Sequence, residues 1–386
     1  REIEVNSKGR EIREISNTPS TKGEDISISI DSRIQEFTHT QLKKFKAGSI
    51  VLLNANSGEV IAMASFPNYD PNQIIQKPNQ KYWNSILKNE LAPLTNRSIQ
   101  GLYSPGSTFK MIVALAALKM GVVNLNDSDF CEGKIEFGDR FYHCWKTRGH
   151  GKMNLIDAIK QSCDVFFYNL SIKVGVDNIA SMAKEFGLGQ VYNFGFVNEK
   201  KGIIPTKKWK KDQYNKSWYA GETLNAAIGQ GYVLTSPLQL AIMISRMASN
   251  GKKIEPTFKN LDNKNIFDNV NIQEKHLKIV KDAMFKVVNE QMGTAFKSKS
   301  TKYNYSGKTG TSQVKKISIE ERESEDFRKL EKEWKNKDHA LFVGYMPTEK
   351  PKYAISVIVE HGGSGAAVAA PVAKSIFDFV YNLEKS

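Results

Sequence analysis

Apolar runs typical of β-strands lie near both ends of this chain, and helical patterns fill the middle. Residues 48–53 and 59–64 flank an Asn-rich and Gly-containing turn, which predicts a β-hairpin. Further strands are predicted at 305–314, 340–345 and 353–360. Strands at the two ends with helices between them predict an α+β domain, whose sheet joins the two ends of the sequence.

The segment from Ser107 to Met120 has the strongest helical pattern. Its apolar residues cover a face broad enough to be buried, and Gly121 supplies the stop. Other helices are predicted at 155–174, 178–186, 237–250, 275–290 and 370–383.

The first 46 residues form a polar stretch that we expect to be an arm ahead of the main domain, residues 47–386. Within it, the alternating run Ile26–Ile30 predicts a strand. With 40% hydrophobic and 25% charged residues among 386, the chain has a globular composition, which excludes disorder, collagen and coiled coil. The charged stretch 319–338 favours a solvated loop or an exposed helix.

The chain is strongly basic, with 55 Lys and Arg against 41 Asp and Glu, a net charge of +14. This charge favours a polyanionic neighbour: an anionic membrane, a cell-wall polymer or nucleic acid. Residues 207–211 and those that follow interleave lysines with aromatic side chains, a pattern that can bind nucleic acid by stacking. We nevertheless expect a solvated loop there and no nucleic-acid partner. No stretch reaches the roughly 18 uncharged apolar residues of a spanning helix, so any membrane anchor is expected upstream of Arg1.

Ser107 and Lys110 are the first candidate catalytic pair. A spacing of three residues places both side chains on one helix face, so the amine can accept the serine proton. The same spacing recurs at four other serines, and the spacing alone is therefore unspecific; these are Ser85, Ser181, Ser249 and Ser312. Only Ser107 follows a Ser-Pro-Gly turn that leads directly into a strong helix, which distinguishes it.

Two more short motifs follow in the sequence. Ser162-Cys163-Asp164 can be a catalytic motif or simply a polar start of the next helix. The segment 308–311, Lys-Thr-Gly-Thr, lies on a predicted strand that can either accept an extended peptide at its edge or be an ordinary edge strand.

The three cysteines of the chain and one histidine fall within 33 residues. Cys131, Cys144, His150 and Cys163 suit tetrahedral zinc, although the paired C-x-x-C spacing is lacking. A Cys131–Cys144 disulfide and three unlinked cysteines are the alternatives. Since Cys163 lies inside the second motif, a metal there would have a structural role, and we expect no cofactor in catalysis.

Taken together and in this order, Ser-x-x-Lys, Ser-x-Asp and Lys-Thr-Gly resemble the motif set of the penicillin-binding transpeptidases. The chain is most similar to the elongation-specific class B enzymes. The resemblance is carried by blocks at 96–110, 148–151, 218–223, 228–231 and 307–314.

The resemblance implies a transpeptidase fold, an antiparallel sheet flanked by helices, for residues 47–386, with residues 1–46 as a remnant of a non-catalytic pedestal. It implies that Ser107 is the acylated nucleophile, Lys110 its base and Ser162 a proton relay. Substrate contacts would come from the strand motif: Lys308, Thr309, Gly310 and Thr311. Asp164 departs from the Asn usual in the wider family, cannot donate an amide hydrogen bond, and could instead bond to Lys110.

By this resemblance the chain is a peptidoglycan D,D-transpeptidase that cross-links stem peptides during cell elongation and is inhibited by β-lactams. The resemblance also implies the partners RodA, a glycan polymerase, and MreC, a scaffold protein. It places the domain on the periplasmic side of the bacterial inner membrane, held by an N-terminal helix outside this chain. The rival readings are a hydrolytic β-lactamase or carboxypeptidase, and a β-lactam sensor or scaffold without turnover.

Overall fold

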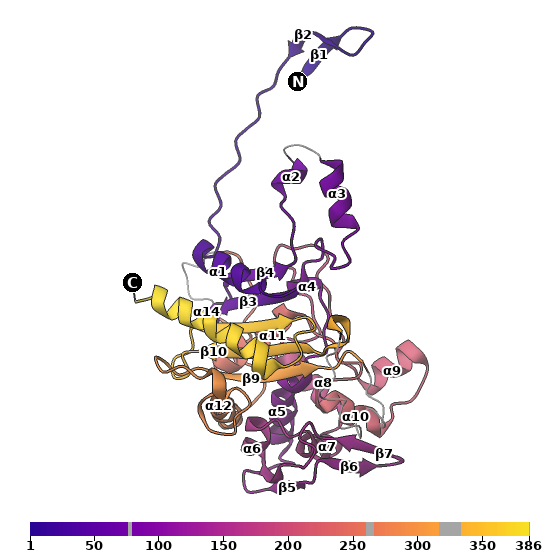
Figure 1. Cartoon of the computed structure of the whole chain (residues 1–386), viewed down its shortest axis with the longest axis vertical. Helices are drawn as coiled ribbons and strands as arrows, with labels where there is room; N and C mark the ends of the chain where they lie inside the picture. The colour runs from indigo at the N-terminus through magenta and orange to yellow at the C-terminus, as the bar shows by residue number, and fades with distance from the viewer. Residues whose placement is uncertain (76–78, 260–265, 316–332, 386) are drawn as a thin grey trace.

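The computed structural model describes residues 1–75, 79–259, 266–315 and 333–385 (Figure 1). The charged stretch 319–338 lies outside the described residues as far as residue 332. In the described part of the chain, no helix is both long and apolar enough to cross a membrane.

The centre of the fold is a five-stranded antiparallel sheet with the order β4-β3-β11-β10-β9. Its strands are β3 (Gly48–Asn54), β4 (Val60–Phe66), β9 (Ser306–Ser312), β10 (His339–Met346) and β11 (Tyr353–Val359). The N-terminal hairpin β3–β4 joins the C-terminal strands because β3 pairs with β11. The predicted α+β class, and the sheet that joins the two chain ends, are therefore confirmed.

Helices cover both faces of the sheet. Every residue of β3 from Gly48 to Leu53 is buried, which explains why this strand is an unbroken apolar run rather than an alternating one. On one face lie α1 (Ser32–Leu42) and α14 (Ala370–Leu383), and on the other lies α11 (Pro237–Ala248) (Figure 1). The predicted C-terminal helix is confirmed at both of its ends.

A second group of elements forms a helical region beside the sheet. Among the described residues, its helices are α5 (Lys110–Met120), α6 (Leu155–Lys160), α7 (Asp164–Val174), α8 (Val176–Glu185), α9 (Lys207–Tyr214) and α10 (Ala220–Ala227). Helix α12 (Glu274–Asn289) packs against β9 and α6, and α4 (Arg97–Gln100) packs against β3 and β4. Helices α2 (Asn72–Ile75) and α3 (Gln80–Leu87) lie on the opposite side of the sheet from α5 (Figure 1). Short turns of other helix types are η1 (Gly106–Phe109), η2 (Phe296–Ser298), η3 (Trp334–Asn336) and η4 (Gly365–Ala369). Small strands complete the chain: β1 (Glu2–Val5), β2 (Glu11–Ser16), β5 (Ser128–Cys131), β6 (Lys134–Phe137), β7 (Arg140–His143) and β8 (Gly151–Asn154).

The N-terminal stretch differs from the prediction in two respects. The run Ile26–Ile30 is not assigned as a strand: Ile26 is 85% exposed, and within the described residues the run makes one isolated bridge, from Ile28 to Lys259. Helix α1 lies within residues 1–46 but packs on the main body, where the Gln35 side chain exchanges hydrogen bonds with the backbone of Met63. The part that projects from the body is therefore shorter than 46 residues, and it ends in the β1–β2 hairpin (Figure 1).

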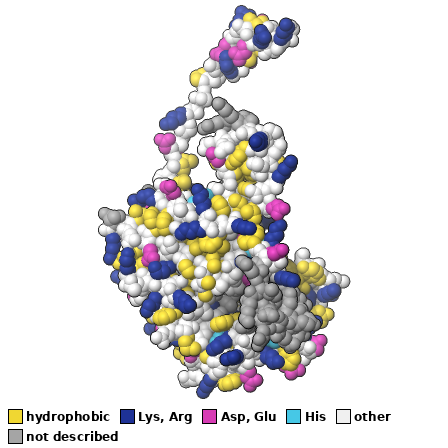
Figure 2. Space-filling view, in the orientation of Figure 1, with side chains coloured by type: hydrophobic (Ala, Val, Ile, Leu, Met, Phe, Trp, Pro, Cys, Tyr) yellow, Lys and Arg dark blue, Asp and Glu magenta, His cyan; other side chains and the backbone are white. Residues whose placement is uncertain are grey.

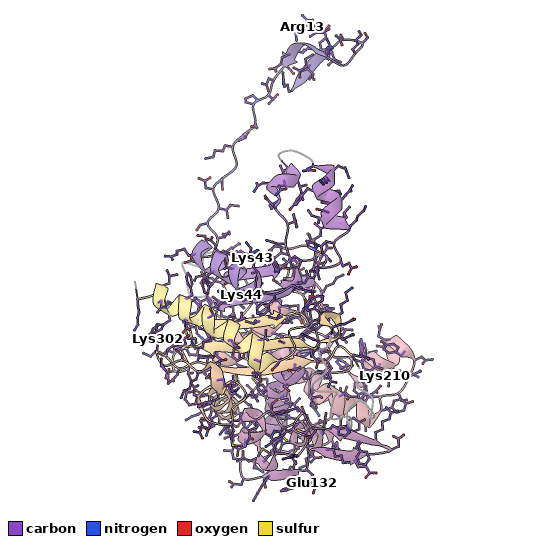
Figure 3. The ribbon with its side chains drawn as sticks, in the orientation of Figure 1. Arg13, Lys43, Lys44, Glu132, Lys210 and Lys302 are labelled. Atoms are coloured by element: carbon purple, nitrogen blue, oxygen red, sulfur yellow. The ribbon has the colours of Figure 1, made fainter. Side chains whose placement is uncertain are left out.

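Two other predictions are corrected in the middle of the chain. The single helix predicted over 155–174 is broken between α6 and α7, at the second motif. The basic stretch 207–211 forms helix α9 instead of a loop, and Figure 3 labels Lys210 on this helix. The Lys210 side chain is buried and forms an ion pair with Glu222. The remaining basic residues are dispersed over the visible face among acidic and apolar side chains rather than gathered in one patch (Figure 2).

Candidate active site

Ser107 lies on η1, a tight turn that leads into the buried helix α5. The turn is held on two sides, because the Gly106 N–H donates to Gly229 O at 3.0 Å and Gly106 packs against Thr311 of β9. Gly106 has φ +55°, and a Cβ there would lie 2.6 Å from Thr311 O, so only glycine fits. This contact is the physical reason for a glycine directly before Ser107.

Lys110 is fully buried one 3₁₀ turn after Ser107, and residues three apart in such a turn lie on the same side. Its Nζ donates to Ser162 O at 2.9 Å, to Ser162 Oγ at 3.2 Å and to Asp164 Oδ1 at 2.7 Å. All three N–H groups of a charged ammonium thus have acceptors. Among the described residues, none of these bonds goes to Ser107, so the direct Ser107–Lys110 contact expected from the spacing is not formed.

The second motif lies at the break between α6 and α7. Ser162 has φ +58°, a left-handed conformation that is strained for a serine. Its Oγ accepts from both Lys110 Nζ and Lys308 Nζ, the latter at 2.9 Å. The structure therefore brings Lys110, Ser162 and Lys308, which lie far apart in the sequence, into direct contact.

The third motif lies on β9, the edge strand of the sheet, as predicted. Lys308 is fully buried, and Thr309 Oγ1 is 2.7 Å from Thr294 Oγ1. Gly310 lies against the Ser107 turn, since a Cβ there would approach Pro105 O to 3.0 Å. Thr311 is exposed, and its carbonyl accepts from Gln230 Nε2 at 3.1 Å.

Asp164 is a carboxylate close to two buried lysines, Lys110 and Lys308. Burial, and then the positive charge of Lys110, hold the pKa of Lys308 well below its usual value of 10.5. Burial raises the pKa of Asp164, and the nearby Lys110 opposes this shift. Asp164 Oδ1 lies 2.7 Å from Lys110 Nζ, and the lowered pKa of Lys308 favours its neutral form.

Asp164 uses both carboxylate oxygens. Oδ1 accepts from Lys110, and Oδ2 accepts from the backbone N–H of Trp145 at 2.8 Å. The bond to Lys110 that the sequence left open for this unusual Asp is formed.

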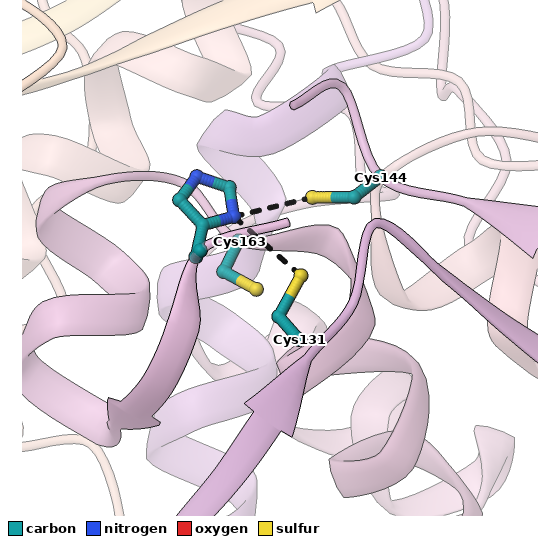
Figure 4. A group of neighbouring side chains, drawn as sticks. Cys131, Cys144 and Cys163 are labelled. Atoms are coloured by element: carbon teal, nitrogen blue, oxygen red, sulfur yellow. Dashed lines mark hydrogen bonds between the residues drawn. The ribbon is translucent and has the colours of Figure 1, made fainter. Parts of the chain in front are cut away.

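The four metal-ligand candidates lie together, as Figure 4 shows. Cys131 Sγ and Cys144 Sγ are 3.6 and 3.4 Å from His150 Nδ1, and all four ligand atoms lie within 4.8 Å of one another. Ligand atoms around a tetrahedral zinc are separated by roughly 3.5–3.8 Å, so the cluster matches the size of such a site. The three cysteines are free, so the Cys131–Cys144 disulfide is not formed.

The thiols of this cluster differ in acidity. Hydrogen bonds from Cys163 and His150 lower the pKa of Cys144 to about 2 against the opposing effect of burial. The pKa of Cys163 is raised, first by its hydrogen bond to Cys144 and then by burial, and burial raises that of Cys131. Three sulfur atoms and one imidazole nitrogen, with a lowered thiol pKa at Cys144, form a donor set that fits a soft divalent metal.

Several residues of the site were not singled out from the sequence. Thr294 faces Thr309, and Trp145 donates hydrogen bonds to the second motif. Gln230 lies within the block 228–231 that carries the family resemblance, which was its only signal. Trp145 directly follows a proposed metal ligand, but nothing in its own pattern indicates where its N–H groups point.

Comparison with known proteins fits this geometry. The family model "Penicillin binding protein transpeptidase domain" matches residues 48–378, most of the chain. The chain belongs to the penicillin-binding protein transpeptidase family. It is 31% identical to the Escherichia coli K12 peptidoglycan D,D-transpeptidase MrdA over 98% of this chain. The alignment covers 61% of MrdA, so the chain spans less than two thirds of this curated relative.

Solved penicillin-binding proteins share the fold. Pseudomonas aeruginosa PBP2, solved in complex with WCK 5153, is 36% identical with a TM-score of 0.82, covering 92% of this chain and 78% of that one. The complex between PBP2 and MreC from Helicobacter pylori contains a chain 30% identical with a TM-score of 0.86, covering all of this chain and 69% of that one. The expected transpeptidase fold and the similarity to the PBP2 group are confirmed.

Proposed function

We propose that this penicillin-binding domain is a serine D,D-transpeptidase that cross-links peptidoglycan stem peptides during cell elongation and is trapped by β-lactams. The observation that carries the proposal is the convergence of Lys110 and Lys308 on Ser162 beside the Ser107 turn. The name of the MrdA relative supports the reaction class.

In the proposed reaction, Ser107 Oγ attacks the carbonyl carbon of the D-Ala-D-Ala bond. The Ser107 proton passes to Lys110, the C–N bond breaks, and the leaving amine takes a proton through Ser162. An amine of a neighbouring stem then attacks the ester carbonyl and releases Ser107 with its proton restored. The backbone N–H of Ser107 can stabilise the oxyanion, whereas the N–H groups of Gly106 and Thr108 already donate to Gly229 O and Pro105 O.

A base must be neutral before it can take the Ser107 proton, and the contacts support one route to that state. Ser162 Oγ bridges Lys110 and Lys308, so a proton can move from one amine to the other through the hydroxyl. A substrate carboxylate near Lys308 favours its charged form. Substrate binding then draws the proton away from Lys110 and readies it as the general base.

The edge of β9 is the proposed substrate platform. An extended stem peptide can add to a free strand edge through backbone hydrogen bonds. Thr309, Gly310 and Thr311 would line the peptide, and Gly310 leaves room for the close approach of the Ser107 turn.

Hydrolytic turnover and a sensor or scaffold without turnover are the alternatives. A hydrolase would share the acylation step with the transpeptidase. A scaffold would lack it. Rapid loss of a penicillin label would indicate a hydrolase, and no labelling at all would indicate a scaffold. The intact set of Ser107, Lys110 and Lys308 favours the transpeptidase.

A structural zinc held by Cys131, Cys144, His150 and Cys163 forms the second part of the proposal. Four protein ligands leave no open position, so the ion would supply no catalytic water. Its bond to Cys163 would fix the second motif, which includes Ser162 and Asp164, against the insert containing β5–β8.

The setting of the reaction is also proposed. The domain would lie on the periplasmic side of the inner membrane, anchored by a helix outside this chain. MreC is a proposed partner because a PBP2 relative was solved with it. RodA is proposed from the resemblance alone, and no nucleic-acid partner is proposed.

Fluorescent penicillin labelling tests the function directly. We expect the label on the peptide that contains Ser107, and we expect Ser107→Ala to abolish it. An adduct at Ser85, Ser181, Ser249 or Ser312 would overturn the assignment of the nucleophile. A label that persists in water would favour the transpeptidase over a hydrolase, because neither water nor an amine acceptor readily resolves the penicillin acyl-enzyme of a transpeptidase.

A further inference from the structure

Trp145 combines high exposure with well-placed hydrogen bonds. Its side chain is large and apolar, yet the residue is 58% exposed. The indole Nε1 nevertheless donates to Gln161 O at 3.1 Å and to Ser162 O at 3.0 Å. The ring lies edge-on against His150, with the centroids 5.3 Å apart.

These bonds end on the backbone that determines the direction of Ser162 Oγ. Ser162 occupies a left-handed conformation that a serine does not adopt without support from its surroundings. Its carbonyl accepts from Trp145 Nε1 and from Lys110 Nζ at the same time. The indole therefore holds the peptide unit on which one of the two buried lysines is placed.

The backbone of Trp145 contacts the same motif a second time. Its N–H donates to Asp164 Oδ2, while Asp164 Oδ1 accepts from Lys110. Both N–H groups of this one residue thus hold the two groups that orient Lys110: the carbonyl of Ser162 and the carboxylate of Asp164.

We propose that Trp145 is a positioning residue for acylation: its indole N–H holds the Ser162 peptide so that Ser162 Oγ bridges Lys110 and Lys308. This inference rests on the proposed acyl-transfer function. Trp145 touches no reacting atom in this role, so it should act on the rate of the chemical step and not on the capture of substrate.

The alternative role for Trp145, an exposed tryptophan beside Ser162, is a direct contact with the substrate. Acylation kinetics distinguish the positioning role from the substrate contact. Loss of a positioning bond lowers the acylation rate constant at saturating penicillin. Loss of a substrate contact raises the dissociation constant of the non-covalent complex and leaves the rate constant unchanged.

The experiment replaces the indole N–H and keeps the ring. Trp145→Phe retains an aromatic contact with His150, and substitution of Trp145 by 3-benzothienylalanine retains the full bicyclic shape with sulfur in place of N–H. We expect both variants to acylate roughly tenfold more slowly at saturating penicillin, the effect of about one hydrogen bond, with the dissociation constant changed less than about twofold. Trp83→Phe, at a partly exposed tryptophan on α3, is the matched control and should be unchanged.

Each outcome decides the inference. Wild-type rates in the benzothienylalanine protein, or a loss confined to the dissociation constant, would overturn the positioning role while the transpeptidase function stands. The isostere gives this answer even if Trp145→Phe fails to fold. Absence of acylation in the unmodified protein would overturn the proposed function and this inference with it.

Discussion

Replacing Lys308 by methionine should make the protein more stable and less active at mildly alkaline pH. Lys308 is fully buried beside the ammonium of Lys110, and its pKa lies well below 10.5. At pH values between this lowered pKa and 10.5, the Lys308 side chain is therefore protonated in the unfolded chain and neutral in the folded chain. In that window the free energy of unfolding rises with pH by about 1.4 kcal/mol per unit. Methionine fills a similar volume and carries no proton.

The expected size follows from the contacts. At about pH 8, keeping Lys308 neutral in the fold costs about 3 kcal/mol relative to an unfolded pKa of 10.5. The substitution removes hydrogen bonds to Ser162 Oγ and Thr309 O, which contribute about 1 kcal/mol each. Lys308→Met should then be about 1 kcal/mol more stable than the unmodified protein at pH 8. The two proteins should be equally stable near pH 9, and the variant should be the less stable one above that pH.

Urea unfolding of both proteins across this pH range measures the difference, with Lys297→Met, at an exposed lysine, as the control that should show no pH-dependent offset. Acylation by a penicillin carboxylate should fall at least about tenfold in Lys308→Met, and acylation by the neutral methyl ester should fall less. A variant that is less stable at pH 8, or a stability difference that does not change with pH, would refute the argument that Lys308 is held neutral.

Two further outcomes are expected. Lys110→Ala should slow acylation roughly 100-fold or more at saturating penicillin, because the general base is lost, and a rate near that of the unmodified protein would exclude Lys110 as the base. The purified protein should contain about one equivalent of zinc by elemental analysis, and chelation or Cys144→Ser should lower the unfolding temperature, since metal binding contributes to folding free energy. Metal-free protein with three titratable thiols and no response to a chelator would leave the cysteines as buried apolar residues.

Local sequence pattern predicted those elements whose signal lies within their own residues. Helix α14 has an amphipathic repeat that ends where the helix ends, and the β3–β4 hairpin has a turn between two apolar runs. The run Ile26–Ile30 alternates just as well, but a strand needs a partner, and among the described residues only Ile28 has one, in a single bridge to Lys259. Alternation in a short segment does not show whether a neighbouring strand is available to pair with it.

The break at the second motif could not be predicted from the same kind of evidence. Residues 155–174 have a helical pattern, but Ser162 leaves the helical region because Lys110, Lys308 and Trp145 hold its carbonyl and hydroxyl. All three partners lie outside the segment itself. The ligand cluster was found from sequence because cysteine is rare in this chain, whereas Trp145 has no such compositional signal.

The pairing of β3 with β11 also has a consequence for the order in which the site is completed during synthesis of the chain. Ser107, the proposed nucleophile, is synthesised long before Lys308 and before the strands that carry the sheet across to β3, which lie in the last quarter of the given sequence. Until β11 arrives, the inner edge of β3 has no partner, and the Ser107 turn lacks the β9 wall against which Gly106 packs. A chain synthesised only as far as β8 therefore carries Ser107 without Lys308, and the proposed acyl transfer requires that β9, β10 and β11 have been made.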